Sequence, residues 1–171
     1  MACGPHPRPP STTPSTSVYK RDGWGLVYTN LRVPYTVLVR YLAHDINFAE
    51  FLAEVDVKVG HTSSYRTRRR AYRKCERGIA IVWGCAFVAR QRILAENITH
   101  RILRAMGVEP LIYPCPGCAV RHHEYFPLLQ VGGLVGMERV ILAAIRATGQ
   151  TRVDKIVFDE SGRQIRKFRV S

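Results

Sequence analysis

The sequence predicts a mixed α/β (α+β) domain in which helices flank a small, central antiparallel sheet, and three features support this. Short segments rich in β-branched and aromatic residues alternate with segments whose apolar residues recur at helical spacing. Glycines and prolines separate several of these segments. The chain has 171 residues, 46% of them hydrophobic, which is enough to bury a core in one domain.

The first third of the chain is predicted to be largely extended. Residues 25–31 and 35–39 are rich in β-branched and aromatic residues, with Pro34 between them, so we expect two strands. Residues 55–60 alternate between apolar and other side chains, as a half-buried strand does. The intervening residues 44–54 could form a short helix or a loop.

The middle of the chain predicts two helices around a further strand. Residues 66–74 follow N-capping side chains at residues 62–64 and form a basic helix. Residues 79–83 are apolar and form a strand. Residues 89–106 form a strong helix, for which Gly107 is a natural C-cap. Its expected apolar stripe consists of Ile93, Leu94, Ile98, Ile102 and Met106.

The last third contains shorter elements. A loop rich in proline and cysteine precedes an extended HHEYF segment. Residues 137–147 form a helix, and residues 155–170 form a hairpin that turns at the sequence Asp-Glu-Ser-Gly.

We expect three regions along the chain. Residues 1–18 are rich in proline, serine and threonine and are predicted to be a disordered tail. Residues 19–130 form the principal domain, and the helix and hairpin of residues 131–171 pack on that same domain.

The charge of the chain points to a polyanionic partner. There are 26 Lys and Arg residues against 13 Asp and Glu, a formal net charge of +13. This favours nucleic acid, with an anionic membrane surface or simple solubility as alternatives. We expect no membrane insertion, because no apolar run approaches the roughly 20 residues of a membrane helix. The N-terminal MACGPHPRPP lacks the apolar core of a signal peptide, so we expect an intracellular protein, nuclear or cytoplasmic, that is not secreted.

Six short motifs follow one another along about 70 residues. They are Lys58-Val-Gly60-His-Thr62, Arg68-x3-Tyr72, Cys75, Glu96-x3-His100, Cys115-x2-Cys118 and His122-His-Glu124-Tyr-Phe126. With the preceding Gly25-Leu-Val-Tyr28, this order resembles the GIY-YIG nuclease superfamily. The resemblance is to the branch named for a bacteriophage T-five DNA-binding domain, which is common in fungal and phage proteins, and it covers about residues 25–126.

The resemblance implies a metal-dependent endonuclease and assigns roles to four residues. Arg68 matches the arginine that contacts the scissile phosphate, and Glu96 matches the glutamate that binds one divalent cation such as Mg²⁺. Tyr28 matches the first-strand tyrosine that positions or deprotonates the attacking water, although Tyr35 or Tyr41 could take this place. Tyr72 matches the residue that assists from the first helix.

These roles agree with the chemistry of phosphodiester cleavage. Negative charge grows on the phosphoryl oxygens, and a guanidinium with a hard cation stabilises it. Arg68 and Tyr72, four residues apart, share one face of a helix. Each residue also has an ordinary interpretation: Arg68 as a solvated arginine, Glu96 as the ion-pair partner of Arg92 or His100, and Tyr28 as a core aromatic.

Further basic residues are expected to contact the backbone of duplex DNA without reading its sequence. They are Lys58, Arg66, Arg69, Arg70, Arg73 and Lys74. Lys58 stands where founding members of the superfamily have their second tyrosine.

The cysteines suggest a structural zinc site. Cys115 and Cys118 have the spacing of a zinc knuckle, and Cys75 with His122 or His123 would complete a Cys3His set. Such a site would tie the basic helix to the cysteine loop. The alternative is a Pro-Gly turn that carries incidental cysteines.

The sequence therefore predicts a DNA-binding protein that resembles a GIY-YIG endonuclease and uses Mg²⁺ or another divalent cation. Two alternatives remain open: a catalytically inactive DNA-binding module on the same fold, and a zinc-stabilised RNA-binding or interaction protein. The sequence does not indicate a target preference or an oligomeric state.

Overall fold

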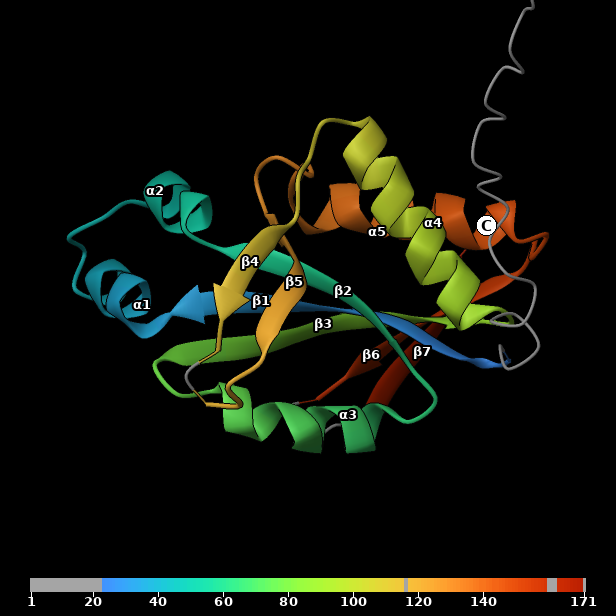
Figure 1. Ribbon diagram of the computed structural model, residues 1–171, viewed down its shortest axis with the longest axis horizontal. Coiled ribbons are helices and arrows are strands. Elements are labelled where there is room, and N and C mark those ends of the chain that lie inside the picture. The colour runs from blue at the N-terminus through green and yellow to red at the C-terminus, as the bar shows by residue number, and fades with distance from the viewer. Residues whose placement is uncertain (1–22, 116, 160–162, 171) are drawn as a thin grey trace, which may run out of the picture.

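The computed structural model describes residues 23–115, 117–159 and 163–170, which are arranged around one seven-stranded sheet (Figure 1). The strand order is β4-β5-β2-β1-β3-β6-β7, and each neighbouring pair is antiparallel. The predicted α+β class with a central antiparallel sheet is therefore confirmed. The predicted tail, residues 1–18, lies outside the described residues.

The strands are β1 (Gly25–Pro34), β2 (Asp56–Thr62), β3 (Ile79–Ala89), β4 (Leu111–Pro114), β5 (Arg121–Pro127), β6 (Val153–Phe158) and β7 (Gln164–Val170). The helices are α1 (Tyr35–Leu42), α2 (Phe48–Ala53), α3 (Tyr65–Tyr72), α4 (Arg92–Ala105) and α5 (Gly133–Ala147). A short 3₁₀ turn, Arg73–Cys75, continues α3. Helices α4 and α5 lie on one side of the sheet and α3 lies on the other (Figure 1).

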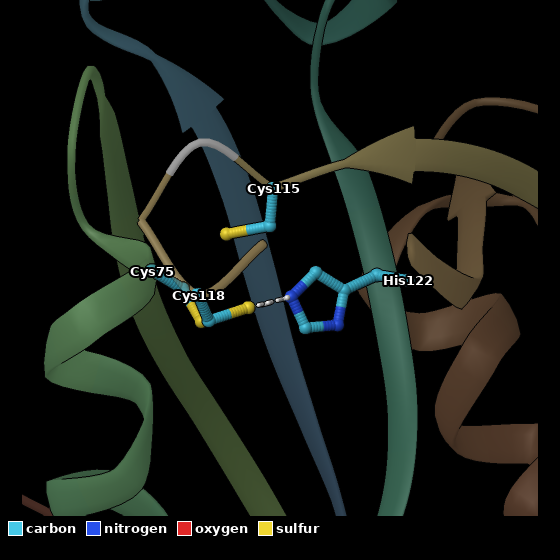
Figure 2. A group of neighbouring side chains, drawn as sticks. All are labelled: Cys75, Cys115, Cys118 and His122. Carbon is cyan, nitrogen blue, oxygen red and sulfur yellow. Dashed lines mark hydrogen bonds between the residues drawn. The ribbon is translucent and has the colours of Figure 1, made fainter. Parts of the chain in front are cut away.

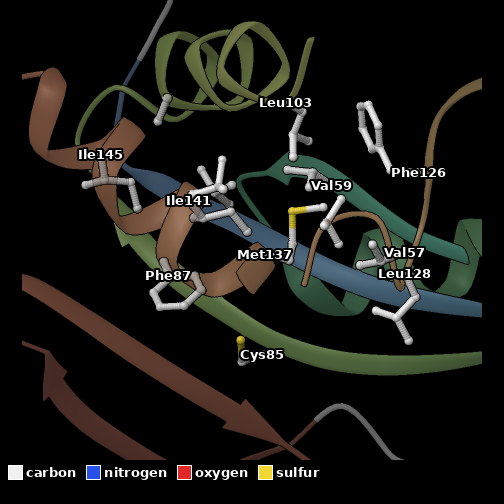
Figure 3. Close-up of a cluster of buried hydrophobic side chains, with 14 of the residues drawn as sticks. Val57, Val59, Cys85, Phe87, Leu103, Phe126, Leu128, Met137, Ile141 and Ile145 are labelled. Atoms are coloured by element: carbon white, nitrogen blue, oxygen red, sulfur yellow. The ribbon is translucent and has the colours of Figure 1, made fainter. Parts of the chain in front are cut away.

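The two faces of the sheet carry different side chains, because alternate residues of a strand point to opposite faces. On the α4–α5 face, Val27, Val57 and Val59 join Met137 and Ile141 of α5 in the main hydrophobic core (Figure 3). The α3 face carries a smaller cluster, in which buried Tyr72, Cys75 and Cys115 pack with Ile81 and Trp83. The α3 face therefore presents the aromatic and polar side chains.

The strand predicted at residues 35–39 is wrong, because Tyr35–Leu42 forms helix α1. Pro34 ends β1 with extended backbone (φ −59°, ψ 135°) and serves as the N-cap of α1. Val37 is buried and Leu38 packs against the core, whereas Val39 is 63% exposed. Burying two consecutive side chains on one side suits a helix, and this outweighed the β-branched composition of the segment.

Residues 44–54, left open between helix and loop, contain helix α2. Asn47 and Glu50 form a reciprocal capping box at its start: the Asn47 side chain accepts from the backbone of residues 49 and 50, and Glu50 accepts from the Asn47 N–H. The α2 ring of Phe51 lies 4.5 Å from Tyr41 of α1. The two short helices therefore form one lobe at the end of β1.

The long helix of the middle region differs from its prediction in start and orientation. Strand β3 continues through Ala89, and α4 begins at Arg92. The buried residues of α4 are Ala95, Glu96, Thr99 and Leu103, whereas Met106 is 54% exposed. The predicted stripe is therefore correct only in part: Ile93, Leu94, Ile98 and Ile102 are half-buried and Ile102 packs against the core, but the fully buried face is the neighbouring one that carries Ala95, Thr99 and Leu103.

The predicted end of α4 is confirmed. Gly107 has a left-handed φ of +78°, its N–H donates to Arg104, and the N–H of Val108 donates to Leu103. These bonds satisfy carbonyls that the last turn of a helix otherwise leaves unpaired.

The C-terminal elements extend the sheet. The HHEYF segment is extended and lies in β5, and β6 pairs with β7 as the predicted hairpin. Residues 160–162 of the predicted turn lie outside the described part of the chain. Among the described helices, none is long and apolar enough to cross a membrane.

Candidate functional site

Helix α3 is fixed on its face of the sheet by two tyrosines. Ser64 caps the helix by accepting from the N–H of Thr67 at 3.4 Å. Tyr65 and Tyr72, seven residues apart, are both buried against Trp83 of β3, with ring centroids 5.1 and 5.4 Å away. Residues at this spacing share one helix face, so Arg68, between them, is directed at the sheet.

Arg68 meets the tyrosine of the first strand. Its Nε donates a hydrogen bond of 2.8 Å to the hydroxyl of Tyr28, which is fully buried. The hydroxyls of Tyr28 and Tyr72 are also hydrogen-bonded to each other. The structure thus brings together three of the four residues that were assigned catalytic roles, one from β1 and two from α3.

The two phenols are neutral in this environment. Burial, followed by the proximity of Tyr72, raises the pKa of Tyr28 well above its ordinary value, and burial likewise raises the pKa of Tyr72. Both hydroxyls therefore remain protonated at neutral pH. The buried Tyr28 hydroxyl can hold Arg68 and Tyr72 in place, and both phenols are poorly suited to removing a proton.

Gly60 makes room for this arrangement. It pairs with Tyr28 across β1 and β2, and a Cβ atom at residue 60 would lie 2.4 Å from the Tyr28 hydroxyl oxygen. Any side chain here would push the tyrosine away from Arg68.

We expect Gly60→Ala to lower the free energy of unfolding by about 1–3 kcal/mol, because overpacking a close-packed interior is destabilising. Chemical denaturation measures this change. Gly23→Ala is the matched control, because its new Cβ would meet only Arg92 Nη1, at 3.9 Å. Equal effects of the two substitutions would contradict the tight contact at Gly60.

A cavity of about 370 Å³ opens beside Arg68. Its walls include Lys58 of β2, Tyr72 of α3 and Glu124 of β5. Lys58 is only 2% exposed and forms an ion pair with Glu124. Burial alone would raise the pKa of Glu124, but the Lys58 ammonium outweighs burial and holds that pKa below its usual value. Lys58 thus belongs to the cavity wall and lies apart from the exposed arginines of α3.

Glu96 occupies a different position. It is 6% exposed on α4, and its carboxylate contacts Nδ1 of His61 on β2. His61 directly follows Gly60, and successive strand residues point to opposite faces. Glu96 therefore approaches β2 from the α4 side, whereas Arg68 approaches from the α3 side. The carboxylate that shares the cavity with Arg68 is Glu124.

The ordinary helix-surface partners expected for Glu96 do not hold it. Arg92 instead donates from Nη1 to the carbonyls of Gly23 and Trp24. His100, one turn after Glu96, has a buried Nε2 without a hydrogen-bond partner within the described residues. Burial lowers the pKa of His100, so its imidazole is neutral at pH 7. The α4 side of β2 therefore holds a buried carboxylate close to an unpaired ring nitrogen.

The outer edge of β2 is only partly covered. Strand β5 pairs with it at residues 56–58 and no further. Beyond Lys58, the edge that carries Gly60 and His61 is not paired with β5. At this edge Gly60 is buried and His61 is half-buried.

The remaining basic residues of α3 face solvent. Arg66, Arg70, Arg73 and Lys74 are exposed, and Arg69 is half-buried beside a small cavity lined by Trp83. With Arg68, the helix carries four arginines in eight residues. This gives the surface around the larger cavity a strong positive charge.

Next to the cavity lies a Cys3His cluster. The sulfur atoms of Cys75, Cys115 and Cys118 and a ring nitrogen of His122 all lie within 4.8 Å of one another (Figure 2). His122 Nε2 is 3.6 Å from Cys75 Sγ and 3.4 Å from Cys118 Sγ. Tetrahedral zinc, with Zn–S of about 2.3 Å and Zn–N of about 2.0 Å, places sulfur and nitrogen about 3.5 Å apart. The cluster can therefore hold a metal such as zinc, with His122 rather than the exposed His123 as its fourth member.

Local structure brings the four residues together. Cys75 ends the 3₁₀ turn after α3, and Cys115 and Cys118 come from the loop between β4 and β5. The N–H of Ala119 donates to Cys115 O, which closes this loop. Gly117 is essential to the contact, because a Cβ there would lie 1.7 Å from the carbonyl oxygen of Lys74.

Comparison with known proteins finds no matching family model, no similar curated protein and no similar solved structure. The relation to GIY-YIG nucleases therefore stays a prediction that depends on the motifs.

Two features of the site were not predicted from the sequence: the contact of His61 with Glu96 and the ion pair of Lys58 with Glu124. The sequence of β2 does indicate the side of His61, because His61 lies two and four residues after the apolar Val59 and Val57. Alternate strand residues share a face, so His61 is expected on the face of the main core. The pairing of Lys58 depends on β5, 66 residues later, and has no local signal.

Proposed function

We propose that this protein binds duplex DNA with the α3 surface and hydrolyses a phosphodiester at the cavity beside Arg68, as a GIY-YIG-type endonuclease does. The observation that carries the proposal is the convergence of Arg68, Tyr72 and Lys58 on one cavity below an arginine-rich helix, with the buried hydroxyl of Tyr28 holding Arg68 from behind. Three of these residues come from motifs that the resemblance assigns to catalysis.

Arg68 is suited to hold a phosphate in a defined orientation. Its Nε is committed to Tyr28, so the plane of the guanidinium is fixed and its two Nη groups are available for paired hydrogen bonds. Lys58 adds a second positive charge in the same cavity. Both positive charges would stabilise the negative charge that develops on the phosphoryl oxygens during hydrolysis.

The tyrosines take the role of orienting groups. Tyr28 and Tyr72 are hydrogen-bonded to each other and stay neutral, because burial raises the pKa of each phenol. The Tyr72 hydroxyl, in the cavity wall, would hold the attacking water in line with the phosphate. Tyr28 is fully buried and would position Arg68 and Tyr72 through its hydroxyl, and its raised pKa argues against a role in deprotonation.

We assign the binding of a divalent cation to Glu96. Lys58 already neutralises Glu124, whereas the partner of Glu96 is the imidazole of His61. The unpaired Nε2 of His100 offers a further partner for the water shell of a cation. A bound Mg²⁺ would supply Lewis acidity and lower the pKa of a bound water.

Nicking of supercoiled plasmid in Mg²⁺ tests both the function and the choice of carboxylate. We expect the wild-type protein to nick the plasmid, with EDTA abolishing the reaction. Glu96→Gln should lower the rate by about 10²-fold or more, the size of effect seen when a group that stabilises the transition state is removed. Glu124→Gln should lower it less, and added Mg²⁺ should not restore it. The opposite order would place the cation at Glu124.

Binding without cleavage is the second candidate, and one observation favours it. Glu96 and Glu124 are each engaged by a side chain of β2. In that case the wild-type protein would bind duplex DNA equally well with EDTA or Mg²⁺ and would not nick it.

Both candidates require contacts from α3 to DNA phosphates, which salt titration measures. The slope of log affinity against log salt concentration reports the phosphates neutralised, at about 0.9 per contact on duplex DNA. We expect Arg66→Gln or Arg70→Gln to reduce that slope by about 0.9. An unchanged slope in both variants would exclude the exposed face of α3 from the interface.

A further inference from the structure

A separate cavity, of about 260 Å³, lies near the N-terminal end of β1. Its walls include Trp24, Arg90, Arg152 and Arg169. None of these residues belongs to the motifs or to the cavity at Arg68. An aromatic ring beside three guanidinium groups is a composition that needs an explanation of its own.

The walls of this cavity are held in place by hydrogen bonds to the backbone. Arg92 Nη1 donates to the carbonyls of Gly23, at 2.9 Å, and Trp24, at 3.2 Å, which fixes the backbone at the tryptophan. The side chain of Gln150 is 7% exposed, accepts from the N–H of Arg90 at 2.8 Å and donates to the carbonyl of Arg152 at 2.9 Å. The ring and the two arginines therefore extend from a fixed framework.

The side chains combine a stacking surface with positive charge. Trp24 is 61% exposed, and the guanidinium of Arg90 lies over its ring at 5.1 Å. Asp154 also lines the cavity, but it is bound by Lys167 at 2.8 Å and by Arg169 at 3.4 Å. Arg90 and Arg152 are exposed and form no ion pair within residues 23–115, 117–159 and 163–170. The cavity is therefore net positive.

The position of the cavity relates it to Arg68. Val88 of β3 lines the cavity and pairs with Leu26 of β1. Leu26 is two residues from Tyr28, so Leu26, Val88 and Tyr28 lie on the same face of the sheet. Trp24 precedes Tyr28 by four residues, about 13 Å along an extended chain. Phosphates of one B-DNA strand are spaced about 3.4 Å apart along the helix axis, so a distance of this size spans a few nucleotides.

We propose that this cavity binds an unpaired nucleotide of a nucleic-acid strand, with the base stacked on Trp24 and the backbone phosphates on Arg90 and Arg152. Stacking on an aromatic ring requires a base that is not paired within a duplex. The proposal deepens the function proposed above and rests on it in one respect, the duplex contact of α3. The substrate would then be a duplex with a single-stranded segment a few nucleotides from the bond held at Arg68, such as a flap, gap or branch.

Tryptophan fluorescence tests the contact directly, because the chain has only two tryptophans. Titration of the wild-type protein with a short single-stranded oligothymidylate should quench part of the emission, and high salt should reverse the quenching. In Trp24→Phe the remaining emission, from Trp83, should not change. Absence of quenching in the wild type, or equal quenching in Trp24→Phe, would overturn the proposal.

Affinity measurements on two labelled substrates separate this site from the duplex contact. The wild-type protein should bind a duplex with a five-nucleotide single-stranded extension about tenfold more tightly than the blunt duplex, the gain expected from stacking one base. Trp24→Ala and Arg152→Gln should lose this gain and keep the affinity for the blunt duplex. Arg139→Gln, an exposed arginine of α5, is the charge control and should change neither value.

The outcomes distinguish the two proposals. A tenfold gain that persists in Trp24→Ala would overturn the present inference even if the plasmid is nicked. Conversely, quenching of Trp24 by single strands without any binding of blunt duplex would refute the proposed duplex contact and leave this site standing.

Discussion

Replacing Cys115 with serine is expected to remove bound zinc and to lower the stability of the protein by about 4 kcal/mol, the effect of a thousandfold loss of affinity at saturating metal. The four donor atoms lie within 4.8 Å of one another, and serine is a poor substitute for a thiolate ligand. For a chain of this size, the melting temperature should fall by about 10 °C. Zinc analysis and thermal unfolding with and without a chelator measure both effects.

The large effect follows because the site contains core residues of its own cluster. Within the described residues, the hydrophobic cluster around the site has Tyr72, Cys75 and Cys115 as its buried members, with Ile81, Trp83 and Cys118 partly buried around them. Two of its three buried residues are therefore ligands in the proposed site. A metal there would join the end of α3 to the β4–β5 loop, and metal binding would contribute directly to folding.

His122→Ala and His123→Ala form the matched pair for this experiment. His122 belongs to the cluster, whereas its neighbour His123 is exposed. We expect His122→Ala to lose zinc affinity and stability, and His123→Ala to retain both. Purified protein that contains no metal and melts at the same temperature with or without a chelator would refute the zinc site.

Arg68→Lys is expected to lower the rate of DNA cleavage by about 10²–10³-fold, the cost of removing one preorganised group that stabilises the transition state. Lysine keeps the positive charge but loses the planar fork that binds phosphate through two hydrogen bonds. It also loses the Nε hydrogen bond to Tyr28 that orients the group. Affinity for duplex DNA should change little, because the overall charge is preserved.

Single-turnover cleavage at saturating protein measures the effect of Arg68→Lys without a contribution from binding. Arg70→Lys is the control, since Arg70 lies on the same helix but is exposed to solvent. It should cleave at the wild-type rate. If Arg68→Lys also cleaves at that rate, the phosphate is not held by the guanidinium beside Tyr28.

Local patterns predicted the parts of the site that lie within one element. The alternation at residues 55–60 predicted β2, and the four-residue spacing of Arg68 and Tyr72 predicted that both would share one face of α3. The C-x2-C spacing predicted that the sulfur atoms of Cys115 and Cys118 would lie near each other, because a tight turn is sufficient to bring these two residues together. The choice between His122 and His123 required the structure.

Features that depend on the packing of distant elements were not predictable from the sequence. The pattern of α4 indicated an apolar stripe, but it did not show that the sheet would select the face with Ala95 and Thr99. The side of β2 from which Glu96 approaches depends on that rotation. The segment at residues 35–39 has the composition of a strand, and it becomes helical because Val37 and Leu38 turn to one side against the core.

The most direct test of the account is a crystal structure of the Glu96→Gln protein, which should bind DNA without cutting it, in complex with a short duplex. We predict a backbone phosphate in the cavity between Arg68 and Lys58, with its oxygens hydrogen-bonded to the Arg68 guanidinium and the strand passing along α3. A duplex bound on the face covered by α4 and α5, or bound on α3 with no phosphate at Arg68, would contradict the proposal.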